Sequence, residues 1–200
     1  AMMHYHATPE DHAVLEKKGF LLVDSGATYM DGTTDITRTY PLGELTEDEK
    51  RFYTWTLQSH IDLAKAVWLD CCECKMIDTI AREPLWRHLI NYRCGTGHSV
   101  SFVGNVHEGP HALNSRNTTR MRPGMVVTDE PGVYETDLVG IRIENELVCI
   151  HKADNQYGTF LGFEPLTFVP IATSPILPGV LDKDELAWLN DYHRQVFAKL

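Results

Sequence analysis

Residues 19–40, GFLLVDSGATYMDGTTDITRTY, form the clearest structural pattern in this chain because they predict a single β-hairpin. Residues 19–23 are a short apolar run, and residues 36–40 alternate with β-branched side chains; both patterns are typical of strands. The connection between them contains Asp31-Gly32, and an Asp-Gly pair favours a tight hairpin turn. The stretch therefore predicts two antiparallel strands.

Each strand of this predicted hairpin carries an aspartate, Asp24 in the first and Asp35 in the second. The two side chains can meet if they lie nearly opposite each other, which places the centre of the turn near residues 29 and 30. A turn at Asp31-Gly32 would instead put Asp35 about 13 Å along the strand from Asp24. We therefore expect a longer loop or a β-bulge. The alternative is that Asp24 only caps a local turn.

Other patterns extend this hairpin to a mixed α+β fold with antiparallel strands. Thr46 followed by Glu49 is a capping box that opens a helix, and Asp182 with Glu185 opens another. Pro84 kinks or interrupts a third predicted helix. The expected helices cover residues 46–67, 75–89 and 182–196, and the further strands cover residues 126–128, 141–150 and 160–171. We expect one domain over residues 1–200.

The composition is that of a globular chain without a membrane segment or a disulfide framework. The formal net charge of −10 argues against nucleic acid or an anionic membrane surface as the main partner. No apolar run approaches the roughly 18–20 residues that span a bilayer, and no signal peptide is visible. The five cysteines lack disulfide spacing, which favours a reducing cytoplasm. Cys71, Cys72 and Cys74 are interpreted as packing or surface thiols, since no second ligand pair completes a zinc site.

A second pair of acidic residues, Glu130 and Glu144, repeats the arrangement of the two aspartates. A turn centred on residues 137 and 138 places these glutamates opposite each other. Arg142 lies two residues before Glu144 and therefore shares its strand face. An arginine that points into an acidic site needs a partner there; the alternative is an ion pair at the surface.

Five side chains that can bind metal stand out in the sequence: Asp24, Asp35, His98, Glu130 and Glu144. His98 follows Gly95-Thr96-Gly97, whose glycines let the backbone approach an ion closely, although a lone histidine in a loop is more often an ordinary polar residue. Four carboxylates nearly balance the charge of two divalent cations, and such a pair lowers the pKa of a water bound between them. The pattern predicts a hydrolytic site that prefers Mn²⁺, with Co²⁺, Zn²⁺ or Fe²⁺ as alternatives.

Six motifs in this order closely resemble the catalytic domain of Xaa-Pro aminopeptidase (aminopeptidase P), a member of the pita-bread metallopeptidases. They are Val23-Asp24-Ser25-Gly26, residues 31–39 (DGTTDITRT), Gly95-Thr96-Gly97-His98, residues 105–110 (NVHEGP), residues 129–134 (DEPGVY) and Arg142-Ile143-Glu144-Asn145. The similarity continues through residues 162–167 (GFEPLT) and 188–193 (WLNDYH), a tail like that of the longer, cytoplasmic type. The resemblance covers essentially the whole chain and implies the α+β pita-bread fold.

The resemblance implies metal-dependent hydrolysis of the N-terminal Xaa-Pro peptide bond, with a hydroxide bridging two metal ions in a single catalytic domain. The implied metal ligands are the five side chains named above. Glu130 would also serve as general base, and His107 would contact the substrate and stabilise the tetrahedral intermediate. His4 and Arg142 match substrate-side residues. The substrate would be a peptide with proline second, whose ring a shaped pocket can select; a homodimer follows by analogy.

The chain departs from the family pattern in ways that bear on activity. It begins almost at His4, so we expect the opening helices of the fold to be absent and an apolar surface to be exposed or covered by a partner. Cys94 stands where the family usually has histidine, and Ser99 and Ser101 replace glycines. The truncation and Cys94 leave open a fragment that binds metal but is catalytically weak. Two further alternatives on the same fold are a prolidase-like Xaa-Pro dipeptidase, since chain-length preference depends on the absent N-terminal domain, and a peptide-binding module, although such relatives typically lose the metal ligands and all five are present here. Restoring histidine at Cys94 is expected to raise turnover.

Overall fold

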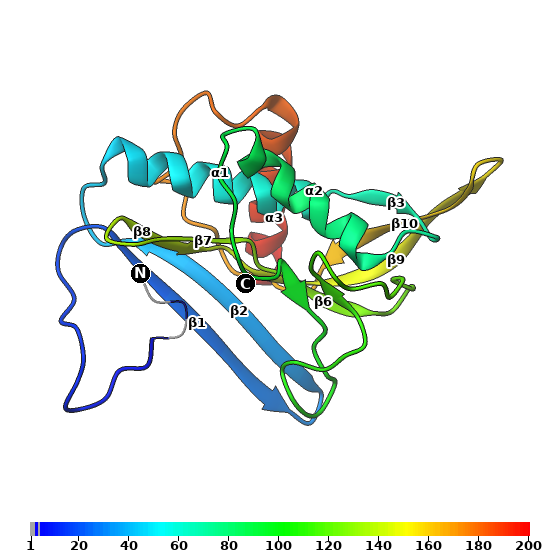
Figure 1. Ribbon diagram of the computed structural model, residues 1–200, viewed down its shortest axis with the longest axis horizontal. Coiled ribbons are helices and arrows are strands. Elements are labelled where there is room, and N and C mark those ends of the chain that lie inside the picture. The colour runs from blue at the N-terminus through cyan, green and yellow to red at the C-terminus, as the bar shows by residue number, and fades with distance from the viewer. Residues whose placement is uncertain (1–2, 4) are drawn as a thin grey trace.

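The computed structural model describes residue 3 and residues 5–200, which form the expected combination of antiparallel strands and helices (Figure 1). The helices are α1 (Glu47–Ala64), α2 (Cys74–Trp86) and α3 (Lys183–Lys199). The strands are β1 (Phe20–Tyr29), β2 (Gly32–Pro41), β3 (Val67–Leu69), β4 (Gly97–His98), β5 (Ala112–Leu113), β6 (Val126–Asp129), β7 (Gly132–Glu135), β8 (Val139–Arg142), β9 (Asn145–Asn155) and β10 (Gly158–Pro165). Within the residues that the structure describes, no helix combines the length and apolarity needed to span a membrane.

The first hairpin is regular, so the expected longer loop or bulge is wrong. All residues of β1 and β2 pair in one unbroken register, with Asp24 opposite Thr37 and Asp35 opposite Gly26. The turn is formed by residues 30 and 31, one residue earlier than a turn at Asp31-Gly32 would be. Asp24 and Asp35 are consequently diagonal neighbours on one face of the hairpin, a spacing of about 7–8 Å that side chains can bridge. No bulge is needed to bring the two carboxylates to one site.

The second acidic pair lies where a long hairpin changes from one ladder to another. β6 pairs with β9, ending at Asp129 opposite Asn145, and β7 pairs with β8, beginning at Gly132 opposite Arg142. The two ladders share one register, which places Glu130 and Glu144 at facing positions between them, as predicted. The expected continuous strand over residues 141–150 is therefore wrong. Residue 131 is a proline, which has no N–H to contribute to a ladder at this break.

The helices cover the sheet and bury two main clusters of apolar side chains. α1 begins with the predicted capping box of Thr46 and Glu49, but it ends at Ala64, because Val67 belongs to β3. One cluster lies between α1, α2 and the sheet of order β3-β10-β9-β6. The other lies between α1, α3 and β8 and includes Tyr53, Ile141 and Tyr192. Figure 1 shows α1 above the β7–β8 hairpin, with the β1–β2 hairpin below it. This packing fixes the strands that carry the acidic residues.

Candidate metal centre

Four of the five predicted ligands line one cleft of about 300 Å³: Asp24, Asp35, His98 and Glu130. The cleft is bordered by β1 and β2 on one side and by the loop that leads into β4 on the other. His107 and Arg142, which sequence motifs had also singled out, line the same cleft. Glu144 is 1% exposed and lies beneath its surface. Chain segments more than a hundred residues apart thus contribute to one site.

Three of these side chains offer ligand atoms close enough to hold one ion. Oxygen or nitrogen atoms of Asp35, His98 and Glu144 all lie within 4.8 Å of one another. Nε2 of His98 is 3.4 Å from Oδ2 of Asp35 and 3.1 Å from Oε1 of Glu130. The same nitrogen of His98 is thus close to both Asp35 and Glu130, which places Glu130 beside the three side chains. Carboxylate oxygens with one imidazole suit a hard or borderline divalent cation.

Asp24 faces the same cleft but is held by an arginine. Nη2 of Arg142 lies 2.5 Å from Oδ2 of Asp24, and its Nε lies 3.8 Å from Oε2 of Glu130. The same side chain donates to the hydroxyl groups of Thr37, at 2.9 Å, and Tyr134. Arg142 is only 4% exposed, so the alternative of a surface ion pair is wrong. The arginine supplies positive charge inside the acidic cluster.

The electrostatics of the cluster favour a bound cation. Burial, followed by the negative charges of Glu130 and Asp35, raises the pKa of Glu144 to about 9. Its Oε1 is buried without a hydrogen-bond partner among the residues the structure describes. Burial alone would lower the pKa of His98, but hydrogen bonds with Asp35 and Glu130 raise it to about 10. An unpartnered buried carboxylate oxygen is costly unless a cation or donor satisfies it, so the residues present fit divalent metal.

The remaining residues predicted for this site have different outcomes. The ring of His107 lies against that of His98, with centroids 3.8 Å apart. The thiol of Cys94 points to the carbonyl oxygen of Gly132 at 3.8 Å, and burial, with the charge of Glu130, raises its pKa. Cys94 is thus a neutral thiol on the wall of the cleft. His4 lies outside the described residues.

Threonine hydroxyls orient the acidic side chains. Thr37 donates to Oε2 of Glu144 at 2.6 Å, and Thr128 donates to Oε1 of Glu130 at 2.9 Å. The hydroxyl of Thr128 also accepts the backbone N–H of His98 at 3.0 Å. Such partners fix the orientation of a ligand and tune its affinity for metal. Sequence reasoning did not assign these threonines, although Thr37 and Thr128 each lie two residues from a predicted ligand.

A buried polar chain beneath the cleft was also missed from the sequence. His60 of α1 lies 3.0 Å from Oδ2 of Asp129, the residue before Glu130. Its other nitrogen is 3.3 Å from the side-chain amide of Asn145, the residue after Glu144. Asn145 in turn accepts from Arg38 at 2.8 Å. The available signal was that Asp129 and Asn145 directly adjoin the two glutamates, but their shared partner is distant in sequence.

Comparison with known sequences places these features in a family. The pattern that defines metallopeptidase family M24 matches residues 1–151, and the pattern of the C-terminal region of peptidase M24 matches residues 159–200. Among curated relatives, aminopeptidase P2 of Arabidopsis thaliana is 44% identical over 100% of this chain and 29% of its own length. A probable Xaa-Pro aminopeptidase P of Coprinopsis cinerea is 42% identical over 100% of this chain and 33% of its own length. The chain thus spans about a third of these relatives.

Comparison with solved structures also finds peptidases that are similar to this chain. X-prolyl aminopeptidase from Caenorhabditis elegans, described as a cytosolic enzyme with a di-nuclear active site, is similar with a TM-score of 0.84 and 39% sequence identity. That similarity covers 89% of this chain and 29% of the nematode chain. A prolidase from Pyrococcus furiosus is similar with a TM-score of 0.64 and 28% identity, over 74% of this chain and 41% of the other.

Proposed function

The chain belongs to metallopeptidase family M24, and on this premise we propose that it is the catalytic part of an Xaa-Pro aminopeptidase. Such an enzyme removes the first residue of a peptide whose second residue is proline. The expected pita-bread fold is confirmed by the family's solved structures. Relatives named probable Xaa-Pro aminopeptidase P match over the whole chain, which supports this activity over others of the fold.

The proposed metal ligands are the five side chains predicted from the sequence: Asp24, Asp35, His98, Glu130 and Glu144. The observation that carries the proposal is the convergence of Asp35, His98 and Glu144 within 4.8 Å, where one buried oxygen of Glu144 has no hydrogen-bond partner among the described residues. The di-nuclear site described for the nematode relative supports two ions rather than one. When bound, two divalent cations, preferably Mn²⁺, would lower the pKa of a water shared between them so that hydroxide forms at neutral pH.

The chain's own residues would then act on the proton and the peptide. Glu130 would accept the proton of the attacking water, with its carboxylate held in place by Thr128. His107 would contact the substrate and stabilise the negative charge that develops on the peptide oxygen, since its ring lies beside His98 at the cleft. Arg142 would hold its fixed position through Thr37 and Tyr134 and contribute positive charge on the substrate side. His4 would complete that side.

The proposed substrate and setting follow from the family. Peptides with proline second would be chosen because proline lacks an amide N–H and has a fixed backbone angle φ. The low number of basic residues relative to acidic ones, 18 against 28, does not favour a polyanionic partner such as nucleic acid. A cytoplasmic location is proposed by analogy with the nematode relative, which is described as cytosolic. A homodimer is proposed from the family resemblance alone.

The test combines metal content with turnover on one sample. After dialysis against a chelator and reloading with Mn²⁺, the chain is expected to bind metal and to release free arginine from an Arg-Pro-Pro peptide. Asp35→Asn should lose metal and turnover together, whereas Asp137→Asn, an exposed acid in the β7–β8 turn, should lose neither. Absence of bound metal in the folded parent chain would contradict the site assignment.

The half-buried, neutral thiol of Cys94 favours a second candidate function, a metal-binding fragment with weak catalysis. A neutral thiol cannot supply the positive charge of a protonated imidazole at this wall of the cleft. In that case the parent chain would bind metal yet release little arginine, and Cys94→His would raise turnover. Cys72→His, in a thiol outside the cleft, is the control and should change nothing. An unchanged or lower rate in Cys94→His would exclude this explanation.

A further inference from the structure

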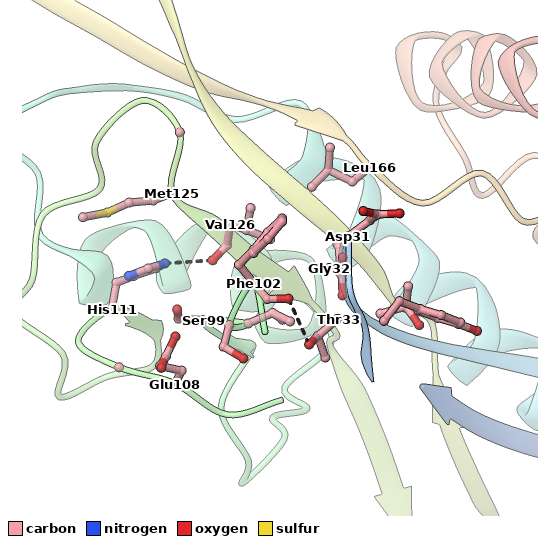
Figure 2. Close-up of a pocket in the computed structure, with 17 residues that line it drawn as sticks. Asp31, Gly32, Thr33, Ser99, Phe102, Glu108, His111, Met125, Val126 and Leu166 are labelled. Atoms are coloured by element: carbon pink, nitrogen blue, oxygen red, sulfur yellow. Dashed lines mark hydrogen bonds between the residues drawn. The ribbon is translucent and has the colours of Figure 1, made fainter. Parts of the chain in front are cut away.

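A second cavity, of about 820 Å³, lies beside the candidate metal centre. It is open to solvent and is bordered by the tip of the β1–β2 hairpin, the loop of residues 99–111 and the start of β6 (Figure 2). It shares no lining residue with the cleft of the metal centre, as far as the described chain shows. The same segments nevertheless form the wall between them, because Ser99 follows His98 and Glu108 follows His107. This second space is called the hairpin-tip cavity below.

Three side chains that line the hairpin-tip cavity each hold one buried polar atom that has no hydrogen-bond partner within the described part of the chain. The atoms are Nδ1 of His111, Oγ of Ser101 and Oε1 of Glu146, in side chains that are 7%, 4% and 8% exposed. Nε2 of His111 lies 2.8 Å from the carbonyl oxygen of Val126, which accepts the proton on that nitrogen (Figure 2). Nδ1 is then left as a free acceptor. Each of the three atoms can accept a hydrogen bond from a ligand.

The charged side chains around this cavity are acidic rather than basic. Asp31, Glu108 and Glu146 line it, and no lysine or arginine does so among the residues that the structure describes. Apolar side chains such as Phe102, Met125 and Leu166 also line it, beside the hydroxyl groups of Thr33, Thr34 and Ser99. Buried acceptors left unpartnered are costly, and a buried carboxylate is more so. The site is therefore built to receive hydrogen-bond donors with positive charge.

We propose that the hairpin-tip cavity binds an organic cation, an alkylammonium or alkylguanidinium group. Its N–H donors would satisfy His111, Ser101 and Glu146, and its carbon stem would pack against Met125 and Leu166. A bare metal ion fits less well. Across residues 3 and 5–200, the trio of acidic, histidine or cysteine side chains close enough for an ion lies at the candidate metal centre instead. The volume also exceeds what an ion needs.

The first experiment measures binding of simple probes to the intact chain by NMR or calorimetry, without any turnover. n-Butylguanidinium and n-butylammonium are expected to bind saturably in the millimolar range, and neutral n-butanol about ten-fold more weakly or not at all. Glu108→Gln, at an exposed rim position, should weaken the cations but not butanol. The matched control Glu135→Gln, an exposed acid on β7 outside the cavity, should leave binding unchanged.

Glu146→Gln should weaken cation binding about ten-fold or more, since it removes a carboxyl group that would accept hydrogen bonds from the cation. Its fold is checked by circular dichroism, and the rim variant Glu108→Gln serves if Glu146→Gln is misfolded. Equal binding of butanol and the cations would overturn the proposal. So would the absence of saturable binding, or cation binding that neither glutamate variant weakens.

A last set of measurements distinguishes two possible occupants of the cavity, a free cation and the side chain of a bound peptide. Peptides that carry lysine or norleucine at successive positions after proline are compared for affinity. A lysine preference that Glu108→Gln removes identifies a peptide side chain as the occupant. A flat peptide series, with n-butylguanidinium still saturating, identifies a free small cation; either result supports the cavity's chemistry. Because binding alone is measured, failure here is distinct from failure of the proposed peptidase activity.

Discussion

Nδ1 of His60 lies 3.0 Å from Oδ2 of Asp129, and neither side chain is exposed to solvent. The pair joins helix α1 to the residue that precedes Glu130, and Asn145 extends it to the residue that follows Glu144. Burial raises the pKa of Asp129 to about 6, and the interaction with His60 opposes that rise. The helix thereby positions both glutamates from behind the cleft.

Substituting His60→Ala is expected to lower the free energy of unfolding by about 3 kcal/mol or more, because it leaves the buried carboxylate of Asp129 without its partner. The affinity for Mn²⁺ should fall as well, because Glu130, a proposed metal ligand, is the residue after Asp129 in the chain. Urea denaturation and a metal titration measure the two effects. The control is His151→Ala, which breaks an exposed histidine–aspartate pair with Asp154 and should leave stability nearly unchanged. Equal losses in both variants would contradict a special role for the buried pair.

The hydroxyl of Thr37 is expected to matter for metal affinity through the orientation of Glu144. It donates to Oε2 of Glu144 at 2.6 Å and accepts from Arg142 at 2.9 Å. Thr37→Val keeps the shape of the side chain but removes both interactions, so the Kd for Mn²⁺ should rise about ten-fold or more. Thr34→Val, in an exposed residue of the same strand, is the matched control. Similar Kd values for the two variants would contradict this role.

Gly97 is expected to tolerate no side chain, because an added Cβ would lie 1.7 Å from the carbonyl oxygen of Thr128. Gly97→Ala must displace either β4 or β6, which should cost about 1–3 kcal/mol of stability and move His98 away from Glu130. Gly95→Ala, two residues earlier, meets its nearest atom at an ordinary 3.4 Å and should have a small effect. Thermal unfolding with and without Mn²⁺ measures both. An effect of Gly97→Ala no larger than that of Gly95→Ala would argue against the close approach.

The sequence predicts the relationships that depend on local spacing. The facing positions of Glu130 and Glu144 follow from one turn between two short strands, and the helix caps at Thr46 and Asp182 follow from neighbouring residues. The hairpin of Asp24 and Asp35 was predicted, but its register was not. A shift of one residue in the position of the turn changes which residues face each other. The Asp31-Gly32 pair indicates a turn nearby but does not determine which two residues form it.

Long-range packing explains what the sequence does not predict. His60 lies on α1 among residues with helical spacing, where it cannot be told from an ordinary core residue. Its partner Asp129 is 69 residues away. The hairpin-tip cavity likewise depends on three segments that are distant in sequence, so no local motif reveals it. Residues next to the predicted ligands, such as Asp129 and Asn145, were the nearest available signal.

The protonation of His193 is expected to lower the stability of the fold as the pH falls from neutral to mildly acidic. Burial and the positive charge of Arg38 lower the pKa of His193 below its ordinary value of about 6.5, while a hydrogen bond to Ile171 partly opposes them. As the pH falls through about 6.5, the unfolded chain therefore binds the proton before the folded chain does, and stability is lost. Buried carboxyls such as Asp129 act in the opposite direction, so the parent and a variant must be compared.

His193→Gln should reduce the loss of stability between pH 7.5 and pH 5.5, because glutamine does not titrate in this range and can still reach the backbone of Ile171. Urea midpoints at the two pH values measure the difference for the variant and the parent. His12→Gln, in an exposed histidine near the N-terminal end, is the control and should keep the parent's difference. If His193→Gln keeps the same difference as the parent, the neutral form of His193 does not contribute to the acid sensitivity of the fold.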